Sequence, residues 1–137
     1  MIAIRQRVLD DIVDQARAEA PSECCGLLIG SVRMGEPAVE ASVRTRNIRK
    51  SATRYQVDPA QHFAAIRHAR AEGREIIGAY HSHPQSAPIP SPTDVAEATY
   101  PDFVYLIVSL LDAGHPEVRA FRIDGGRFTA VPLVAVP

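Results

Sequence analysis

The sequence predicts an α/β fold, in which a mixed sheet has helices packed on it. Two observations lead to this prediction. Segments whose apolar residues recur at helical spacing are interspersed with short segments that are either continuously apolar or alternate between apolar and polar residues. At 137 residues, 46% of them hydrophobic, the chain is also long enough to bury a substantial core. We therefore expect a single domain covering residues 1–137.

The first part of the chain is predicted to form a helix followed by two strands. Apolar residues recur at helical spacing from Ile4 to Ala16, and Pro21 ends this helix. Residues 24–32 are apolar and contain glycines, a pattern typical of a buried strand. Residues 38–46 alternate between apolar and polar side chains, which indicates a half-buried antiparallel strand.

A second helix is predicted to begin at Asp58 and Pro59, because Asp is a preferred N-cap residue and Pro a preferred first helical residue. This helix should end near Gly73 and turn Phe63 and Ile66 towards the core. The other predicted elements are strands at 76–81 and 103–110, a short helix beginning after Ser91, and a terminal hairpin of strands 118–123 and 128–134.

The composition excludes some classes of function. The net charge of −1 argues against a general nucleic-acid-binding protein, which is normally strongly basic. No segment approaches the roughly 20 apolar residues of a membrane span, and the N-terminal residues lack a signal-peptide pattern. We therefore expect a cytoplasmic protein without a membrane partner. A basic run is interpreted as a solvated face, with a docking patch for an acidic protein as the alternative; it contains Arg44, Arg46, Arg49, Lys50 and Arg54.

The only two cysteines, Cys24 and Cys25, are adjacent in the sequence. A disulfide between them would be strained, because consecutive Cα atoms are only about 3.8 Å apart. We interpret them as buried thiols at the start of a strand, and a redox or nucleophilic role is the alternative. Of the five histidines, three are expected on the surface: His62, His68 and His115.

Two histidines and an aspartate have the spacing of a metal site. His81 and His83 lie two apart in a predicted strand, so both rings project from one face of the sheet. Asp94 follows at the start of a predicted helix, with Ser91 as its N-cap. Two imidazoles and a carboxylate form the ligand set of an open catalytic zinc site. Glu23, upstream, is the candidate to deprotonate a water molecule there. The pattern indicates a metallohydrolase.

With these residues in place, the chain closely resembles the JAMM, or MPN-plus, metalloproteases of the small prokaryotic type. The signature of that family is an upstream Glu, then His-Ser/Thr-His, seven residues, Ser, two residues and Asp. The segments 23–30 and 54–59 resemble the family as well, so the resemblance covers nearly the whole chain. The signature is matched by Glu23, His81, Ser82, His83, Ser91 and Asp94.

The resemblance implies a cytidine-deaminase-like fold of three layers, α/β/α, with the sheet between helices. It implies Zn²⁺ held by His81, His83 and Asp94. Glu23 would be the general base, and Ser91 would help to stabilise the oxyanion of the tetrahedral intermediate. Ser82, between the two histidines, is expected to support the ligands rather than to take part in chemistry.

The resemblance also implies a substrate class. Family members cut ubiquitin-like proteins after a C-terminal Gly-Gly, and small bacterial relatives resemble enzymes that act on sulfur-carrier proteins and release cysteine. One alternative is an isopeptidase that removes ubiquitin-like modifiers from lysine, and another is a non-catalytic MPN scaffold. A cytidine deaminase is excluded, because the chain has neither the His-x-Glu nor the Cys-x-x-Cys of that zinc site. The sequence leaves the carrier and the oligomeric state open.

Overall fold

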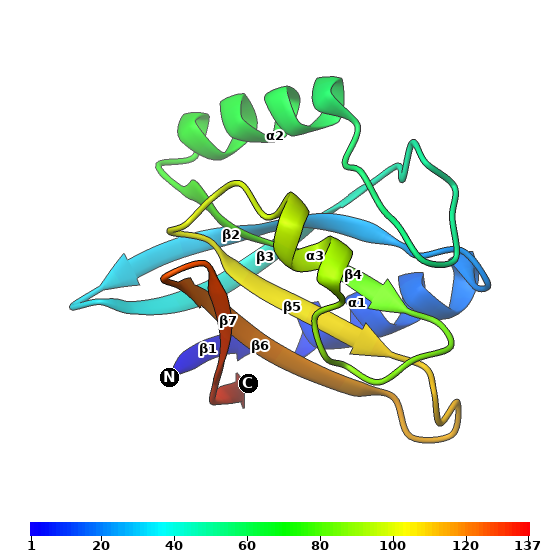
Figure 1. The fold of residues 1–137 in the computed structure, drawn as a ribbon. Helices are drawn as coiled ribbons and strands as arrows, with labels where there is room; N and C mark the ends of the chain where they lie inside the picture. The colour runs from blue at the N-terminus through cyan, green and yellow to red at the C-terminus, as the bar shows by residue number, and fades with distance from the viewer.

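The structure is a computed structural model that describes all of residues 1–137. One eight-stranded sheet runs through the molecule and carries helices on both of its faces (Figure 1). The strands are β1 (Ile2–Arg5), β2 (Cys25–Arg33), β3 (Glu36–Thr45), β4 (Glu75–His83), β5 (Val104–Ser109), β6 (Glu117–Asp124), β7 (Arg127–Val131) and β8 (Leu133–Val136). The helices are α1 (Gln6–Glu19), α2 (Pro59–Ala71) and α3 (Pro92–Glu97).

The strand order is β7-β6-β5-β4-β2-β3-β1-β8, which places β4 and β2 in the middle of the sheet. The strand β4 pairs antiparallel with β2 and parallel with β5. The strand β1 pairs parallel with both β3 and β8, and the remaining pairs are antiparallel. The expected mixed sheet is therefore confirmed.

The sheet separates two hydrophobic cores, because neighbouring residues of one strand point to opposite faces. On one face, Leu28 of β2 and Tyr80 of β4 pack in the same cluster as Ile12 of α1. On the other face, Leu27 belongs to a smaller cluster with Ala65 of α2. The three layers α/β/α that the family resemblance implied are confirmed.

The N-terminal residues form a strand, so the prediction of a helix from Ile4 was wrong at its start. Ile2 and Ile4 are fully buried, whereas Ala3 and Arg5, which alternate with them, are half-buried, and this is the alternation of a strand. Four residues are too few for the strand and helix periods to be told apart by sequence. Parallel pairing with β3 and β8 decides the conformation, and the helix begins at Gln6.

The predicted last strand, 128–134, is two strands separated by Pro132. Proline has no N–H to donate to a sheet ladder, so it ends β7. The chain then crosses to the opposite edge of the sheet, where β8 pairs with β1 and the N–H of Ile2 donates to the carbonyl of Pro132 at 2.9 Å. The predicted hairpin between β6 and β7 is confirmed.

The helix α2 packs on the sheet through alanines rather than through its large apolar residues. Ala65 and Ala69 are its buried residues, and Ile66 is half-buried. Phe63 is 67% exposed, so the prediction that it turns inward was wrong. The small side chains of Ala65 and Ala69 pack α2 on the sheet, and the ring of Phe63 lies outside this packed face, exposed to solvent.

The other two helices differ in how they are held. The helix α1 buries Val8, Ile12 and Ala16 at helical spacing, as the sequence predicted. The helix α3 has only six residues and depends on its N-cap at Ser91. None of the three helices is long and apolar enough to cross a membrane.

We expect Gly78→Ala to destabilise the fold, because β4 and β5 approach each other closely at this residue. A Cβ at Gly78 would lie 2.2 Å from the carbonyl oxygen of Val104, a backbone atom that cannot move aside alone. The expected loss in free energy of unfolding is about 1–3 kcal/mol, measured by urea denaturation. Gly114→Ala is the matched control, because its Cβ would meet nothing closer than 3.6 Å. Equal stability of the two variants would contradict this view of the strand pair.

Candidate metal centre

The two histidines of the motif lie at the end of β4, on the face of the sheet that α2 covers. Their neighbours in the ladder are Cys25 on β2 and Ile107 on β5 for His81, and Ser109 on β5 for His83. Both imidazoles are almost completely buried, at 1% and 4% exposure. Neighbouring strands therefore flank His81 on both sides and His83 on one, and burial leaves both rings little freedom to turn away.

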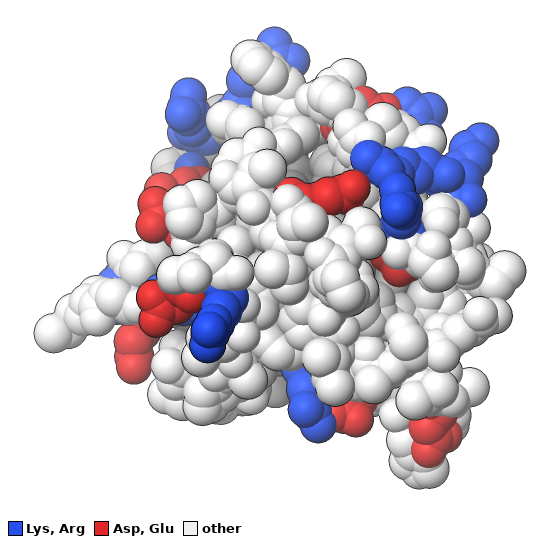
Figure 2. Space-filling model, in the orientation of Figure 1, with Lys and Arg blue, Asp and Glu red and all other residues white.

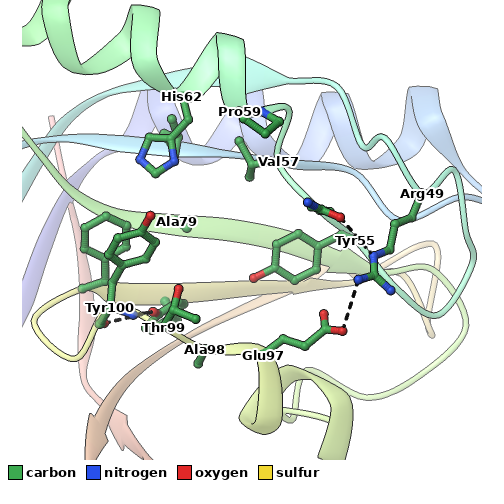
Figure 3. A pocket seen from close by; sticks show the side chains of 14 residues that line it. Arg49, Tyr55, Val57, Pro59, His62, Ala79, Glu97, Ala98, Thr99 and Tyr100 are labelled. Atoms are coloured by element: carbon green, nitrogen blue, oxygen red, sulfur yellow. Dashed lines mark hydrogen bonds and ion pairs between the residues drawn. The ribbon is translucent and has the colours of Figure 1, made fainter.

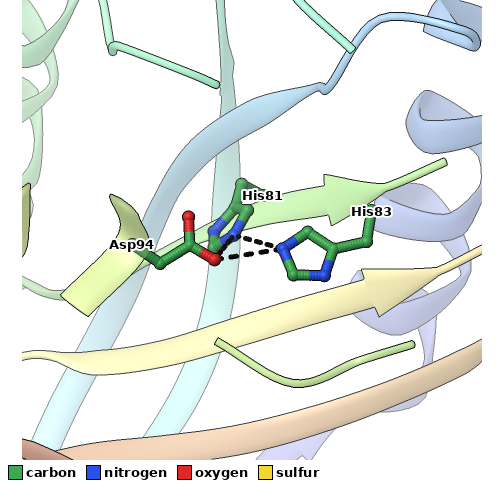
Figure 4. Close-up of side chains that lie close together, drawn as sticks. All are labelled: His81, His83 and Asp94. Atoms are coloured by element: carbon green, nitrogen blue, oxygen red, sulfur yellow. Dashed lines mark hydrogen bonds and ion pairs between the residues drawn. The ribbon is translucent and has the colours of Figure 1, made fainter. Parts of the chain in front are cut away.

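The carboxylate of Asp94 reaches the two imidazoles from the first turn of α3 (Figure 4). Its Oδ2 lies 3.1 Å from Nε2 of His81 and 3.0 Å from Nε2 of His83. The two Nε2 atoms are 3.2 Å apart. Three ligand atoms from the end of β4 and the start of α3 thus form a nearly equilateral triangle, and all three residues predicted from the spacing come together.

This triangle has the dimensions of a tetrahedral metal site. With metal–ligand bonds of about 2.0–2.1 Å, two ligand atoms of a tetrahedral zinc ion lie about 3.3–3.4 Å apart. The three observed separations are within a few tenths of an ångström of this value. The residues present therefore fit a small tetrahedral cation, and one coordination position remains for a non-protein ligand.

The proton on His83 is directed away from the triangle. Its Nδ1 lies 2.8 Å from the carbonyl oxygen of Ala87, an atom that can only accept a hydrogen bond. Neutral His83 therefore carries its proton on Nδ1 and presents the lone pair of Nε2 to Asp94. A lone pair and a carboxylate oxygen 3.0 Å apart repel each other unless a cation or a proton lies between them. The arrangement thus favours a cation at the centre.

The carboxylate of Asp94 is oriented by the capping box of α3. The N–H of Ser91 donates to Oδ2 of Asp94 at 2.9 Å, and the N–H of Asp94 donates to Oγ of Ser91 at 3.0 Å. This confirms the predicted helix start, with Ser91 as N-cap and Pro92 as the first helical residue. The same bonds that begin the helix fix the carboxylate towards the histidines.

The three groups shift one another's pKa values. Burial raises the pKa of Asp94, but in the absence of a metal the hydrogen bonds that His81 and His83 donate when their Nε2 atoms carry a proton outweigh burial, and the net shift is downward. Burial lowers the pKa of His83, and Asp94 reverses this to a net rise. For His81, which is more deeply buried, the lowering by burial dominates. Asp94 is thus ionised at neutral pH, as a metal ligand must be.

Glu23 is a buried carboxyl close to the charges of this triad. Its residue is 2% exposed, and its Oε1 has no hydrogen-bond partner in the protein. Burial raises its pKa to about 8, His83 opposes the rise and the negative charge of Asp94 adds to it. A buried acid with an unsatisfied oxygen and a pKa near neutrality is suited to accept and return a proton.

Two residues that hold this site were not identified by sequence reasoning. Asn47 donates from Nδ2 to the carbonyl oxygens of Glu23 and Arg54, each at 3.0 Å. Its Oδ1 accepts from the N–H groups of Arg49 and Gln56, also at 3.0 Å. Asn47 therefore ties the segment before α2 to the backbone of Glu23. A lone asparagine in a basic segment carries no local signal of such a role.

Tyr55 is the second of these residues. Its ring stacks on the imidazole of His81, with centroids 4.3 Å apart and planes 15° from parallel. Burial raises the pKa of its hydroxyl. The segment that contains Tyr55 was noted in the sequence only for its resemblance to the family. Its ring contributes one wall beside the metal centre.

The residues beside Glu23 and between the histidines are structural. Ser82 lies on the opposite face of β4, where its Oγ accepts a hydrogen bond from the N–H of Cys24 at 2.8 Å. It thus joins β4 to the residue after Glu23. Cys24 and Cys25 are fully buried and unpaired, and burial raises the pKa of their thiols to about 12 and about 11. Buried thiols at the start of a strand, as predicted, are confirmed.

A cavity of about 490 Å³ opens beside the metal centre, between α2 and α3 (Figure 3). Tyr55 lines it and also contacts His81, so the cavity and the metal centre share a wall. Arg49 and Glu97 form an ion pair of 3.5 Å from opposite sides of the cavity. The other lining residues are Leu27, Gln56, Val57, Pro59, His62, Ala79, Ala98, Thr99, Tyr100, Phe103 and Tyr105.

Of the histidines outside the triad, His68 and His115 are exposed, as predicted. The prediction for His62 was wrong, because it is half-buried, lines the cavity and contacts the ring of Tyr100 edge-on, with centroids 5.7 Å apart. Pro59 lines the same cavity three residues earlier. The sequence spacing of His62 gave no indication that this flank of α2 would border a cavity.

Comparison with known proteins gives a consistent result. Residues 5–124 match the family described as prokaryotic homologs of the JAB domain. The CysO-cysteine peptidase of Mycobacterium tuberculosis is 32% identical over 136 residues, covering 99% of this chain and 92% of that protein. A desampylase of Haloferax volcanii is 32% identical over 110 residues, covering 77% and 75%. The solution structure of a Desulfitobacterium hafniense protein superposes with a TM-score of 0.92 at 28% identity, covering 99% and 93%.

The raised pKa of Glu23 predicts how the metal-free protein responds to pH. The carboxyl has a pKa of 4.5 in the unfolded chain and about 8 when folded, so the contribution of Glu23 to stability is fully present below pH 4.5 and is lost as pH rises towards 8. Glu23→Gln removes this loss. In chelator-treated protein the variant should gain on the wild type between pH 5 and 8, by up to about 1.4 kcal/mol per pH unit. Thermal denaturation across this range measures the gain. Glu36→Gln, at an exposed position, is the control for the loss of one negative charge. A stability gain of Glu23→Gln that does not depend on pH would contradict the burial argument.

Proposed function

The chain belongs to the family of prokaryotic homologs of the JAB domain, and we propose that it is a zinc metallopeptidase acting on a ubiquitin-like sulfur-carrier protein. It would hydrolyse the bond after the C-terminal Gly-Gly of that carrier and release cysteine. The observation that carries the proposal is the triangle of buried ligand atoms from His81, His83 and Asp94 beside the buried carboxyl of Glu23.

The proposed roles follow from the geometry. Bound zinc would lower the pKa of a water molecule and polarise the scissile carbonyl. Glu23 accepts the proton of that water on its unpartnered Oε1 and returns it to the leaving amine. Ser91 accepts a hydrogen bond from the N–H of Asp94, so its own O–H is free to donate to the developing oxyanion. Tyr55 limits the access of solvent to His81 by covering its ring.

The choice of substrate is supported by the relatives. The M. tuberculosis protein, which this chain matches over nearly the whole length of both, is named a CysO-cysteine peptidase. The match to a desampylase favours a second candidate function, removal of a ubiquitin-like modifier from lysine. Both would use the same catalytic residues. A non-catalytic scaffold is the weakest alternative, because none of the ligands or the base is missing.

We expect the protein to bind one zinc ion per chain. Asp94→Asn should lower the affinity for zinc strongly, because it removes the negative charge among the three ligand atoms while the amide keeps a similar shape. Elemental analysis of the dialysed protein and titration of zinc into chelator-treated protein measure these changes. His115→Ala, at an exposed histidine, is the control and should retain one ion. Undiminished zinc in a His81→Ala, His83→Ala double variant would contradict the assignment.

Intact mass spectrometry of two substrates tests the reaction. One is a sulfur-carrier protein ending in Gly-Gly-Cys, and the other is a ubiquitin-like protein joined to a lysine side chain. The zinc-loaded enzyme should remove cysteine from the first substrate. Glu23→Gln should abolish this cleavage because it removes the proposed base, and a chelator should abolish it because it removes the metal. Release from lysine alone would establish the isopeptidase instead. Cleavage that persists in Glu23→Gln would disprove the role of the base.

A further inference from the structure

The positive charge of this protein is concentrated in one part of the chain. Residues 41–71 contain seven of the 15 Lys and Arg residues and only one of the 16 acids, Asp58, although the whole chain has a net charge of −1. Figure 2 shows Lys and Arg side chains in two groups in the upper part of the face that it draws, with uncoloured and acidic side chains between them. The seven are Arg44, Arg46, Arg49, Lys50, Arg54, Arg67 and Arg70.

Internal ion pairs account for three of these charges. Arg44 pairs with Asp11 on α1, Arg46 with Asp58, and Arg49 with Glu97. The other four, Lys50, Arg54, Arg67 and Arg70, are exposed and have no acidic side chain within 4 Å. Unpaired arginines bear the full like-charge repulsion of their neighbours, and an external anion would relieve it.

An exposed aromatic ring lies among these cations. Phe63, Arg67 and Arg70 are spaced at i, i+4 and i+7 on α2 and therefore form one exposed strip. The guanidinium of Arg67 lies 5.9 Å from the centroid of the Phe63 ring. Phenylalanine and arginine are enriched in protein–protein interfaces, where an aromatic residue inserts and charges surround it.

This strip begins next to the end of α2 that lines the cavity beside the metal centre and continues along the helix away from it. His62 and Pro59, on the adjoining side of α2, point into that cavity (Figure 3). Lys50 and Arg54 belong to the segment that supplies Arg49 and Tyr55 to the same cavity. We define the basic rim as Lys50, Arg54, Phe63, Arg67 and Arg70.

We propose that the basic rim docks the folded body of the carrier protein through an acidic face next to its C-terminal tail. This deepens the proposed function and rests on it. A tail that reaches the metal centre through the cavity brings the body of its protein against the edge of that cavity. The rim is positively charged, so the complementary partner surface is acidic. A nucleic acid is the competing occupant, and the net charge of −1 disfavours it.

The test compares a folded carrier with its tail. The rim variant is Arg67→Glu with Arg70→Glu. The control, Arg7→Glu with Arg33→Glu, changes the net charge equally at exposed positions on α1 and at the end of β2. The substrates are a sulfur carrier ending in Gly-Gly-Cys and a synthetic peptide of its C-terminal tail. Circular dichroism and zinc content verify that every variant is folded and loaded.

The rim variant should lose about ten-fold in kcat/KM on the folded carrier, mainly through KM, because charges at the rim of an interface act on encounter. The loss should shrink in about 1 M salt, where charges are screened within about 3 Å. Cleavage of the tail peptide, and both activities of the control, should equal the wild type. In zinc-loaded Glu23→Gln protein, which binds without cutting, the rim change should weaken the affinity for the carrier to the same degree.

Three outcomes would overturn the docking surface. Equal cleavage of the folded carrier by the wild type and the rim variant is the first, and equal losses on carrier and peptide are the second. The third is a rim variant that has lost binding only to single-stranded RNA. If the wild type cleaves neither substrate, the proposed function fails, and the docking proposal fails with it. Cleavage of the peptide by the wild type therefore tests the proposed function without the docking surface, and it separates a failure of the docking proposal from a failure of the function.

Discussion

The pairing of β4 with β2 and β5 is the constraint on which the rest of the site depends. His81 lies between Cys25 and Ile107 in the ladders, so its ring can project only to the face that α2 covers. The N–H of Ser82 donates to the carbonyl of Cys24 at 3.1 Å, and the N–H of Cys24 donates back to Oγ of Ser82. These two bonds hold Glu23 beside the histidines. The sheet thus positions the proposed base and two of the proposed ligands without a metal, which is the preorganisation that the proposed catalysis would require.

The third ligand depends on a different kind of interaction. Asp94 returns to the sheet after a proline-containing loop, which Ser109 anchors by donating to the carbonyl of Ser86 at 2.6 Å. One oxygen of Asp94 both completes the ligand triangle and accepts the N–H of Ser91 at the start of α3. Metal binding at this triangle would therefore be coupled to the start of this six-residue helix. A helix so short has little stability of its own, because helix nucleation is unfavourable.

The surroundings of the metal centre, rather than its ligands, distinguish one substrate from another. The ligands and base would be the same for a peptide bond to cysteine and an isopeptide bond to lysine. The cavity beside the triad is bounded by Tyr55 and bridged by Arg49 and Glu97. The ion pair across it is loose and partly exposed, so it is worth at most about 1 kcal/mol and yields readily to a substrate. Under the proposed function, selectivity would arise from what the cavity and its rim contact outside the Gly-Gly.

The sequence by itself determined the cluster of His81, His83 and Asp94 and the helix start at Ser91, because these depend on local spacing, whereas Glu23 was a candidate only through the family resemblance and its type of side chain. Residues two apart in a strand share a face, and a capping box has a fixed spacing of three, so His81, His83 and Asp94 could be identified without a structure. Only the tertiary structure decided what depends on contacts between distant segments. The strand β1 exists because β3 and β8 pair with it, and Phe63 is exposed because alanines pack α2 on the sheet. Asn47 and Tyr55 hold the site through contacts that span 24 and 26 residues, and no local pattern encodes contacts of that length.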